Sequence, residues 1–314
     1  MISIFLTWCG RHTRVIMPCG VLIALLLPGH GEGSKIFVPL ILIVINGLAM
    51  ARLDFSALLR QAIRPRRLLY TGSSAAVLMV FLPIMVFTLA RVLGLPDVLE
   101  PILTWYLVAP PIVTAIWICA LAGADVAFAV ELVVLACALA PFTGPFLADA
   151  FLGEALPLSR FDLFSRLFGV IAAGVILALA LQRFYSRQAL ASPALDGLAT
   201  LAMLAFLVPV FNGIGLVVLA QPMLALGFLG LAMGLNVGSQ VFVMTVLGLG
   251  RTWVPHRYRQ VLAIVTGNRN LGLYFGVLPF DPLLALFTAM YQFPIYVTAL
   301  LQSVFYSVDR KKNS

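Results

Sequence analysis

The feature that most constrains this chain is a series of ten apolar runs that follow one another with short interruptions. A transmembrane helix needs about 20 mostly apolar residues, because the hydrocarbon core of a bilayer is roughly 30 Å thick. Only 10% of the 314 residues are charged, whereas soluble domains carry about 25%. The sequence therefore predicts an all-α polytopic membrane protein with ten transmembrane helices, and it argues against a soluble enzyme, a nucleic-acid-binding protein or a secreted disulfide scaffold. The runs cover residues 15–28, 36–50, 69–93, 99–122, 125–148, 163–183, 195–219, 222–249, 257–279 and 282–307.

The basic residues collect on one side of this predicted topology. Ten spans place both termini on the same side, and that side holds three quarters of the Lys and Arg residues. Because Lys and Arg are enriched in cytoplasmic segments, we expect both termini in the cytoplasm of a multi-pass plasma-membrane protein, with a bacterial inner membrane as the expected location. The same bias explains the net charge of +8 without a nucleic-acid partner. The basic residues on this side are Arg11, Arg14, Arg52, Arg60, Arg64, Arg66, Arg67, Arg183, Arg187, Arg251, Arg257, Arg259, Arg310, Lys311 and Lys312.

Three simpler interpretations find little support in the sequence. A cleaved signal peptide at the first run lacks a small-x-small cleavage site, and the charge pattern needs this run as a span. The cysteines and histidines form no cluster that predicts a metal site, so no metal or cofactor is expected. Without a His-Glu-x-x-His motif, a Gly-x-Ser-x-Gly motif or paired aspartates at membrane depth, we do not expect an enzyme.

The spacing of several motifs indicates an internal duplication. Asp125 opens the fifth run and Asp281 opens the tenth, so their separation is close to half of the chain. Each follows a run with helix-unfriendly residues, at 109–111 in the fourth run and at 266–270 in the ninth. Five spans per copy would turn the second copy upside down. The sequence thus predicts two inverted five-helix repeats, with broken helices 4 and 9 crossing at the bilayer midplane, as in many secondary transporters.

The predicted breaks have a physical consequence at membrane depth. An unpaired backbone group costs several kcal/mol in hydrocarbon, so a broken helix is tolerated only within protein or beside a water-filled cavity. The half-helix ends carry partial charges of about ±0.5, which bind ions and polar groups. We expect Pro110, Pro111 and Gly267 to be helix-break residues. A simple kink is the alternative for the two prolines.

Two charged residues lie deep inside predicted spans, where a charge costs about 3 kcal/mol on insertion scales. Arg269, in the ninth-span break, has a guanidinium that suits a carboxylate, phosphate or sulfonate, but it could equally be a clamp that joins the half-helices. Glu131, in the fifth span, is a candidate proton carrier, because burial favours its neutral form, or else the permanent partner of Arg269. Both alternatives remain open for each residue.

Polar residues near the breaks and in the eighth span are candidate substrate ligands. Cross-helix hydrogen bonding is the alternative role for each of them. Together with Arg269, the candidate substrate-binding residues are Thr114, Thr266, Asn268, Asn270, Asn236 and Gln240.

Three segments resemble the bile acid:sodium symporter family. Residues 109–141 contain the double-proline break, then Gly123-Ala124-Asp125, and resemble the fourth and fifth helices of that family. Residues 263–274 resemble the second helix crossover, and 81–83 (Phe-Leu-Pro) the third helix. The resemblance implies a ten-helix inverted-repeat fold. It implies a panel domain of residues 1–68 and 159–220 (helices 1, 2, 6 and 7) that faces a core domain of residues 69–158 and 221–314 (helices 3–5 and 8–10).

The chain departs from that family at the sodium-binding positions. The usual Glu-x-Gly-x-Gln-Asn of the second crossover is here Val265-Thr-Gly-Asn-Arg269-Asn270, so the carboxylate is Val and the Gln is Arg. The Thr-Ala-Ser-Asn of the first crossover is here 113–116 (Val-Thr-Ala-Ile), and a sodium-site Gln of the third helix is Leu78. Sodium, as a hard cation, needs several oxygen ligands, and a fixed cation nearby would repel it by several kcal/mol.

These departures lead to a functional hypothesis. We expect a sodium-independent transporter of small organic anions by alternating access, in which Arg269 replaces the sodium charge. Sodium is not expected as a coupling ion, and a proton is the candidate. One alternative is a conventional sodium-coupled organic-anion symporter that uses backbone carbonyls and Asn270. A second alternative is a non-transporting membrane receptor on the same fold. The expected partners are the substrate anion and the lipid bilayer.

Overall fold

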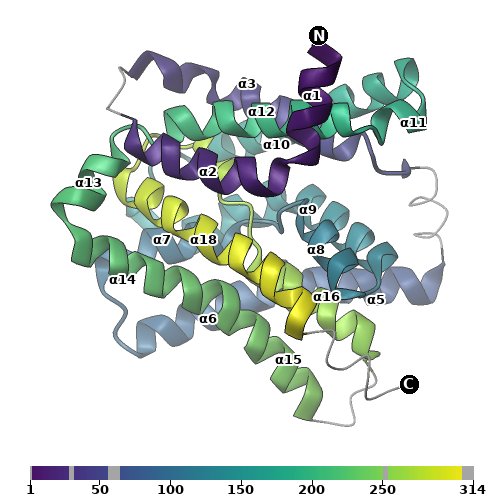
Figure 1. Ribbon diagram of the computed structural model, residues 1–314. Coiled ribbons are helices and arrows are strands. Elements are labelled where there is room, and N and C mark those ends of the chain that lie inside the picture. The colour runs from purple at the N-terminus through teal and green to yellow at the C-terminus, as the bar shows by residue number, and fades with distance from the viewer. Residues whose placement is uncertain (1, 28–31, 56–63, 250–253, 306–314) are drawn as a thin grey trace. The chain divides into compact units, whose positions relative to one another are not determined.

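The computed structural model describes residues 2–27, 32–55, 64–249 and 254–305, and helices dominate these residues (Figure 1). No strand occurs in those ranges, where the only extended pairing is an isolated antiparallel bridge between Pro111 and Arg269. Five helices there are long and apolar enough to cross a membrane, or up to six if the bent pair Ile2–Arg11 and Val15–Leu26 forms one span. These helices indicate a multi-pass membrane protein. They are Pro65–Val92, Val126–Ala155, Arg160–Phe184, Pro193–Val210 and Pro222–Leu249.

The chain divides into two compact units, each formed by three separate stretches. Unit 1 consists of Met1–Leu53, Ser165–Leu226 and Gly272–Ala289, and unit 2 consists of Asp54–Phe164, Gly227–Leu271 and Met290–Ser314. The panel and core domains stay predictions. Residues 272–289, which the family resemblance places in the core domain, cluster with unit 1.

Unit 1 contains the N-terminal helices and the middle of the chain. Three helices cross the division between the units: α10 (Arg160–Phe184), α14 (Pro222–Met233) and α18 (Pro282–Phe305). The other helices of unit 1 are α1 (Ile2–Arg11), α2 (Thr13–Leu26), η1 (Glu32–Phe37), α3 (Val38–Met50), α11 (Arg187–Leu190), α12 (Pro193–Val210), α13 (Ile214–Ala220) and α17 (Gly272–Phe275).

Helices α1 and α12 pack against each other, and their backbones come very close at two glycines (Figure 1). A Cβ atom added to Gly10 would lie 2.8 Å from the Gly197 nitrogen, and one added to Gly197 would lie 2.7 Å from the Leu6 carbonyl carbon. Glycine at both positions lets the two backbones approach this closely, as small residues do in membrane helix pairs. The sequence does not predict α1, because its residues precede the first complete apolar run.

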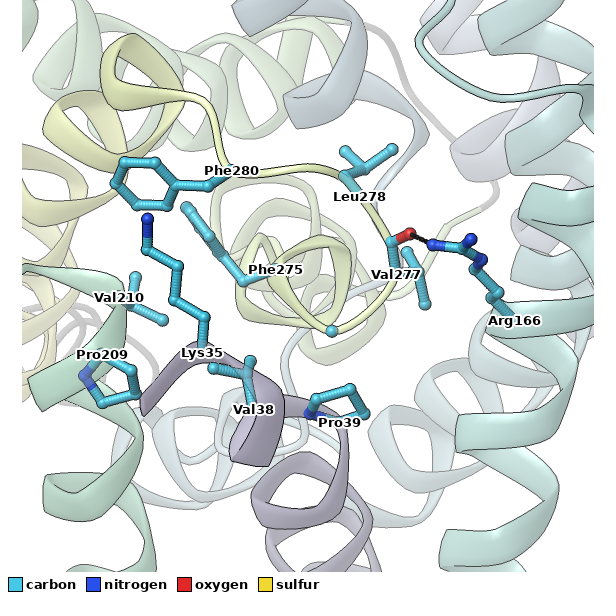
Figure 2. A pocket seen from close by; sticks show the side chains of 11 residues that line it. Lys35, Val38, Pro39, Arg166, Pro209, Val210, Phe275, Val277, Leu278 and Phe280 are labelled. Carbon is cyan, nitrogen blue, oxygen red and sulfur yellow. Dashed lines mark hydrogen bonds between the residues drawn. The ribbon is translucent and has the colours of Figure 1, made fainter. Parts of the chain in front are cut away.

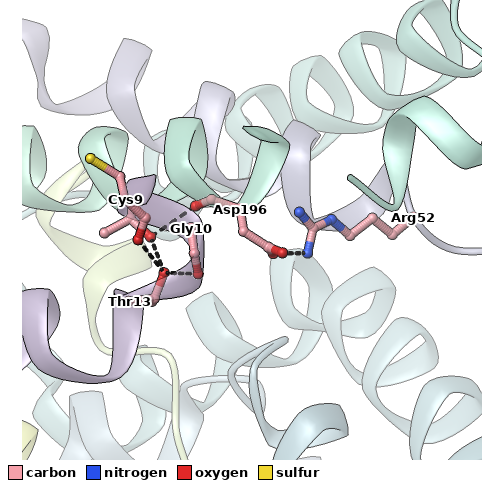
Figure 3. A network of polar contacts seen from close by, with 6 residues as sticks. Cys9, Gly10, Thr13, Arg52 and Asp196 are labelled. Carbon is pink, nitrogen blue, oxygen red and sulfur yellow. Dashed lines mark hydrogen bonds and ion pairs between the residues drawn. The ribbon is translucent and has the colours of Figure 1, made fainter. Parts of the chain in front are cut away.

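A polar network ties α2 to α12 within unit 1 (Figure 3). The Thr13 hydroxyl lies 3.2 Å from the Cys9 carbonyl and 2.8 Å from the Thr200 hydroxyl, and Thr200 also contacts the Asp196 carbonyl at 2.8 Å. The Asp196 carboxylate pairs with the Arg52 guanidinium, which follows α3. This chain of contacts links three helices of the unit.

Unit 2 is organised around the 27-residue helix α9 (Val126–Leu152), which packs against α5, α7, α8 and α16. Asp125 caps α9, because its carboxylate accepts the Phe128 N–H at 2.8 Å, a common way to satisfy the first amides of a helix. The remaining helices of unit 2 are α5 (Pro65–Ala76), η2 (Val77–Phe81), α6 (Leu82–Val92), η3 (Asp97–Leu99), α7 (Glu100–Val108), α8 (Ala115–Ala122), η4 (Gly153–Ala155), η5 (Gly234–Gly238), α15 (Ser239–Leu249) and α16 (His256–Gly267).

Two long helices of the chain contain one π-helical turn each. Segment η2 joins α5 to α6, and segment η5 joins α14 to α15, without ending the helix. A π turn frees backbone groups from the regular α-helical pattern and often lies at functional sites. The seventh apolar run, in contrast, is split into two helices. Helix α12 ends at Val210 and α13 starts after Gly213, whose φ is +77°.

Candidate functional site at two interrupted helices

The first interruption separates α7 from α8. Helix α7 ends at Val108, and Ala109 turns into an extended conformation with ψ of 136°. Pro110 and Pro111 follow, and neither has an N–H that could continue the helix. Helix α8 begins at Ala115.

The second interruption follows α16, whose last residue is Gly267. Asn268 has φ of −110° and ψ of 87°, which are not helical, and the short helix α17 starts only at Gly272. A Cβ atom on Gly267 would lie 2.7 Å from Gln240 Cγ and closer still to the Asn236 carbonyl oxygen. Gly267 is therefore needed for a close approach of η5 rather than for an unusual φ angle.

The two interruptions hydrogen-bond to each other through their backbones. The Ile112 N–H donates to the Asn268 carbonyl at 2.9 Å, and the Asn270 N–H donates to the Pro110 carbonyl at 2.7 Å. Between these bonds lies the antiparallel bridge from Pro111 to Arg269. Each interruption thus satisfies backbone groups that the other leaves without helical partners.

Arg269 lies within this junction and is 1% exposed. Its Nε donates to the Thr266 carbonyl at 3.0 Å, and its Nη1 donates to the Ala109 carbonyl at 3.0 Å. Its Nη2 donates to the Leu78 carbonyl at 3.4 Å, and Nη1 lies 4.0 Å from the Met79 sulfur. One guanidinium therefore contacts both interrupted helices and the π-helical turn η2.

The sequence explains why these carbonyls lack helical donors. The helical partner of the Thr266 carbonyl would be the Asn270 N–H, which donates to Pro110 instead. Leu82 donates to Val77, five residues earlier, so the next donor in this π pattern would be residue 83, which is Pro and has no N–H. The Ala109 carbonyl follows the end of α7. Arg269 therefore satisfies carbonyl oxygens that helix ends and a π turn leave open.

Amide and phenol side chains brace the same junction. Asn236, which is fully buried in η5, donates through Nδ2 to the Gly267 carbonyl at 2.6 Å, and Gln240 donates to the Asn236 side-chain oxygen at 2.9 Å. The Tyr291 hydroxyl donates to the Gly267 carbonyl and accepts the Arg269 N–H at 3.0 Å. These contacts fix the backbone at which α16 ends.

The structure brings most of the candidate substrate-binding residues together, but it buries them. Asn236, Gln240, Thr266, Asn268 and Arg269 are between 0% and 6% exposed. The Thr266 hydroxyl donates to the Leu262 carbonyl at 2.7 Å, and the Asn268 amide donates to the Ile264 carbonyl at 2.8 Å, so both engage their own helix.

Two of the candidate substrate-binding residues are not buried. Thr114, the N-cap of α8, is exposed, and its hydroxyl does not cap the helix. Asn270 is partly exposed. Their roles as substrate ligands stay predictions, and among the candidates these two residues are the ones that are not buried.

Glu131 pairs with Arg67 rather than with Arg269. Its carboxylate lies 2.8 Å from the Arg67 Nε, and the Thr71 hydroxyl donates to it at 3.2 Å. Glu131 is 8% exposed, so this ion pair joins α9 to the first turns of α5 in a mostly buried setting. The alternative that Glu131 is the permanent partner of Arg269 is wrong, and proton coupling through Glu131 stays a prediction.

Sequence reasoning misses several parts of this junction. The Tyr106 hydroxyl donates to the Leu235 carbonyl and lies 3.3 Å from the Thr266 carbonyl, so it links α7, η5 and α16. The π turn η2 is also absent from the sequence-based expectation, although Pro83, shortly after Val77, is a signal for a disturbed helix. The sequence carries no comparable signal for Tyr106, which stands in an apolar run like other aromatic residues.

A separate pocket of about 160 Å³ lies within unit 1 (Figure 2). Figure 2 shows Lys35 and Arg166 on different walls of this pocket. The Lys35 ammonium lies 3.7 Å from the Phe280 ring centroid, and Arg166 Nη1 donates to the Val277 carbonyl at 3.0 Å. Lys35 and Arg166 are the two charged residues among the residues that line this pocket.

Comparisons with known protein families and with curated proteins find no match for this chain. Within the described ranges, no group of three or more His, Cys, Asp or Glu residues could hold a metal ion.

Proposed function

We propose that this protein is a membrane carrier for small organic anions, a divergent relative of the bile acid:sodium symporters, that works without sodium because the Arg269 guanidinium permanently holds the cation position. The observation that carries the proposal is the position of the guanidinium, which contacts carbonyls of both interruptions and of η2. Backbone carbonyls are the ligands that a hard cation prefers. A bound guanidinium supplies the same charge to the same type of oxygen.

The burial of Arg269 favours a role as a fixed charge over a role as a direct substrate ligand. A side chain that is 1% exposed and donates to three carbonyls has little capacity left for a substrate anion. Its charge still acts at a distance, because electrostatic interactions are stronger at low dielectric than in water. The substrate would then contact accessible groups near the interruptions, such as Thr114 and Asn270.

The repeated positions of irregular elements support the inverted-repeat architecture. The π turns start at Val77 and Gly234, and this separation is half the length of the chain. The bridged residues Pro111 and Arg269 have almost the same separation along the sequence. The helix-capping aspartates Asp125 and Asp281 are also separated by almost half of the chain. Asp281 accepts the Leu284 N–H at 3.2 Å, and Asp125 accepts the Phe128 N–H in the same manner. Such a common separation favours two related halves.

The distribution of cations supports an anionic substrate. In the proposed topology, both termini are cytoplasmic, and Lys35 and Arg166 lie on the opposite side of the membrane. Both residues line the pocket in unit 1, where they would raise the local concentration of anions before transport.

An isotope-flux assay tests this proposal against its main alternatives. The full chain in proteoliposomes should accumulate one of a panel of small labelled carboxylates, and unlabelled carboxylate inside the vesicles should accelerate that uptake by exchange. Separate sodium and proton gradients identify the coupling ion, and Glu131→Gln tests the proton route. Saturable binding of a carboxylate without flux would indicate a receptor. Uptake that requires sodium would favour the conventional symporter.

A further inference from the structure

A second site lies on unit 2, in a groove between α5 and α9 that is unrelated to the helix interruptions. The groove has a volume of about 600 Å³ and an almost entirely apolar lining. Its walls include Pro65, Leu68, Leu69 and Gly72 of α5 and Leu135 and Leu139 of α9.

The α5 wall of the groove is open. Leu68 is 52% exposed and Leu69 is 75% exposed. A Cβ atom on Gly72 would meet no other atom within 4 Å. In a membrane protein such a surface faces lipid, and a concave apolar surface can hold an acyl chain.

Two arginines, Arg64 and Arg66, flank Pro65, which is the first residue of α5 that lines this groove. Arg64 is the residue just before α5, and Arg66 lies in the first turn of α5, three residues before Leu69 on the same helix face. Both arginines are exposed, whereas the adjacent Arg67 is bound to Glu131. The groove thus begins beside two cationic side chains that can reach the level of the lipid headgroups.

The length of the groove matches one leaflet of a bilayer. The lining residues on α5 extend from Pro65 to Ala76, which corresponds to roughly 16 Å at a rise of 1.5 Å per residue. Half of the hydrocarbon core is about 15 Å thick. An acyl chain that lies in the groove would therefore have its headgroup at the level of Arg64 and Arg66.

We propose that this groove binds an anionic phospholipid, with one acyl chain between α5 and α9 and the phosphate between Arg64 and Arg66. The charge of the arginines selects an anionic over a zwitterionic lipid, as basic clusters at the cytoplasmic end of membrane helices do. The bound lipid would hold α5 against α9 beside the Arg67–Glu131 ion pair. This site does not depend on the proposed transport function.

Native mass spectrometry and thermal unfolding of the purified full chain test the proposal. Phosphatidylglycerol and phosphatidylcholine with identical acyl chains are the two probes. We expect phosphatidylglycerol to be retained about tenfold more tightly, because each basic residue near the headgroups adds attraction, and to raise the unfolding temperature more than phosphatidylcholine does.

Three variants separate the headgroup contact from the acyl-chain contact. The double variant Arg64→Gln/Arg66→Gln should bind both lipids equally, while Arg183→Gln/Arg187→Gln, with the same loss of exposed charge elsewhere, should keep the preference. Gly72→Trp should fill the groove and reduce retention of both lipids, whereas Gly72→Ala should not.

Several outcomes would overturn the proposal. Equal retention of the two lipids by the wild-type protein would contradict the headgroup site. The same conclusion would follow if Arg183→Gln/Arg187→Gln lost the lipid preference as fully as Arg64→Gln/Arg66→Gln. Unchanged retention in Gly72→Trp would place the lipid elsewhere. A dimer that Gly72→Trp dissociates would assign the groove to a second copy of the chain.

Discussion

Arg269→Ala should reduce anion uptake by at least about a hundredfold and should lower the apparent unfolding temperature by several degrees. The change removes the guanidinium donor from the carbonyls of Thr266, Ala109 and Leu78. Each unsatisfied buried polar group costs about 1–3 kcal/mol, and every 1.4 kcal/mol changes an equilibrium about tenfold. Uptake in proteoliposomes and thermal unfolding in detergent measure the two effects.

Two further variants separate charge from folding. Arg269→Lys retains the charge but lacks the planar fork of the guanidinium, so it should keep part of the uptake and of the stability. Arg183→Ala, at an exposed end of α10, is a control that should change neither. Full uptake by a folded Arg269→Ala variant would contradict a functional role for the buried charge and leave Arg269 as a structural clamp.

Gly267→Ala should have the second-largest effect, although it adds only one methyl group. That methyl would lie 2.7 Å from Gln240 Cγ and 2.8 Å from Gln240 Nε2, and still closer to the Asn236 carbonyl. Overpacking typically costs about 1–3 kcal/mol, and here it would separate η5 from the end of α16. We expect a clear loss of uptake together with a lower unfolding temperature, measured on the same preparation.

Gly230→Ala is the matched control for this variant. Gly230 lies in α14, and a Cβ atom there would meet nothing within 4 Å, so alanine should leave uptake unchanged and favour the helix slightly. Equal behaviour of the two alanine variants would show that the close approach at Gly267 is not required.

The two helix interruptions can be predicted from the sequence because the residues that cause them lie at the interruptions themselves. Pro110 and Pro111 cannot donate helical hydrogen bonds, and an arginine in the middle of an apolar run is costly enough to attract notice. The pairing of the two interruptions depends on contacts between distant segments. It can be inferred only from the idea of a duplication, which the spacing of Asp125 and Asp281 supplies.

The partners of the buried charges cannot be predicted in the same way. Glu131 pairs with Arg67, far earlier in the sequence, because α5 packs against α9, and a single sequence does not show which helices are neighbours. The carbonyl of Leu78 is an acceptor because of a π turn, so its role is independent of its apolar side chain. The pattern of side chains in the sequence therefore cannot predict that the Leu78 carbonyl accepts a hydrogen bond from Arg269.

The most direct test of a guanidinium in the cation position is a sodium titration. The purified wild-type protein and the Arg269→Gln variant are both titrated, and choline replaces sodium so that the ionic strength stays constant. We expect the unfolding temperature and the anion uptake of the wild-type protein to be independent of sodium, and Arg269→Gln to gain a sodium response, because its carbonyls are again open to a cation. Saturable sodium dependence of the wild-type protein would contradict a permanent replacement of the metal ion by Arg269.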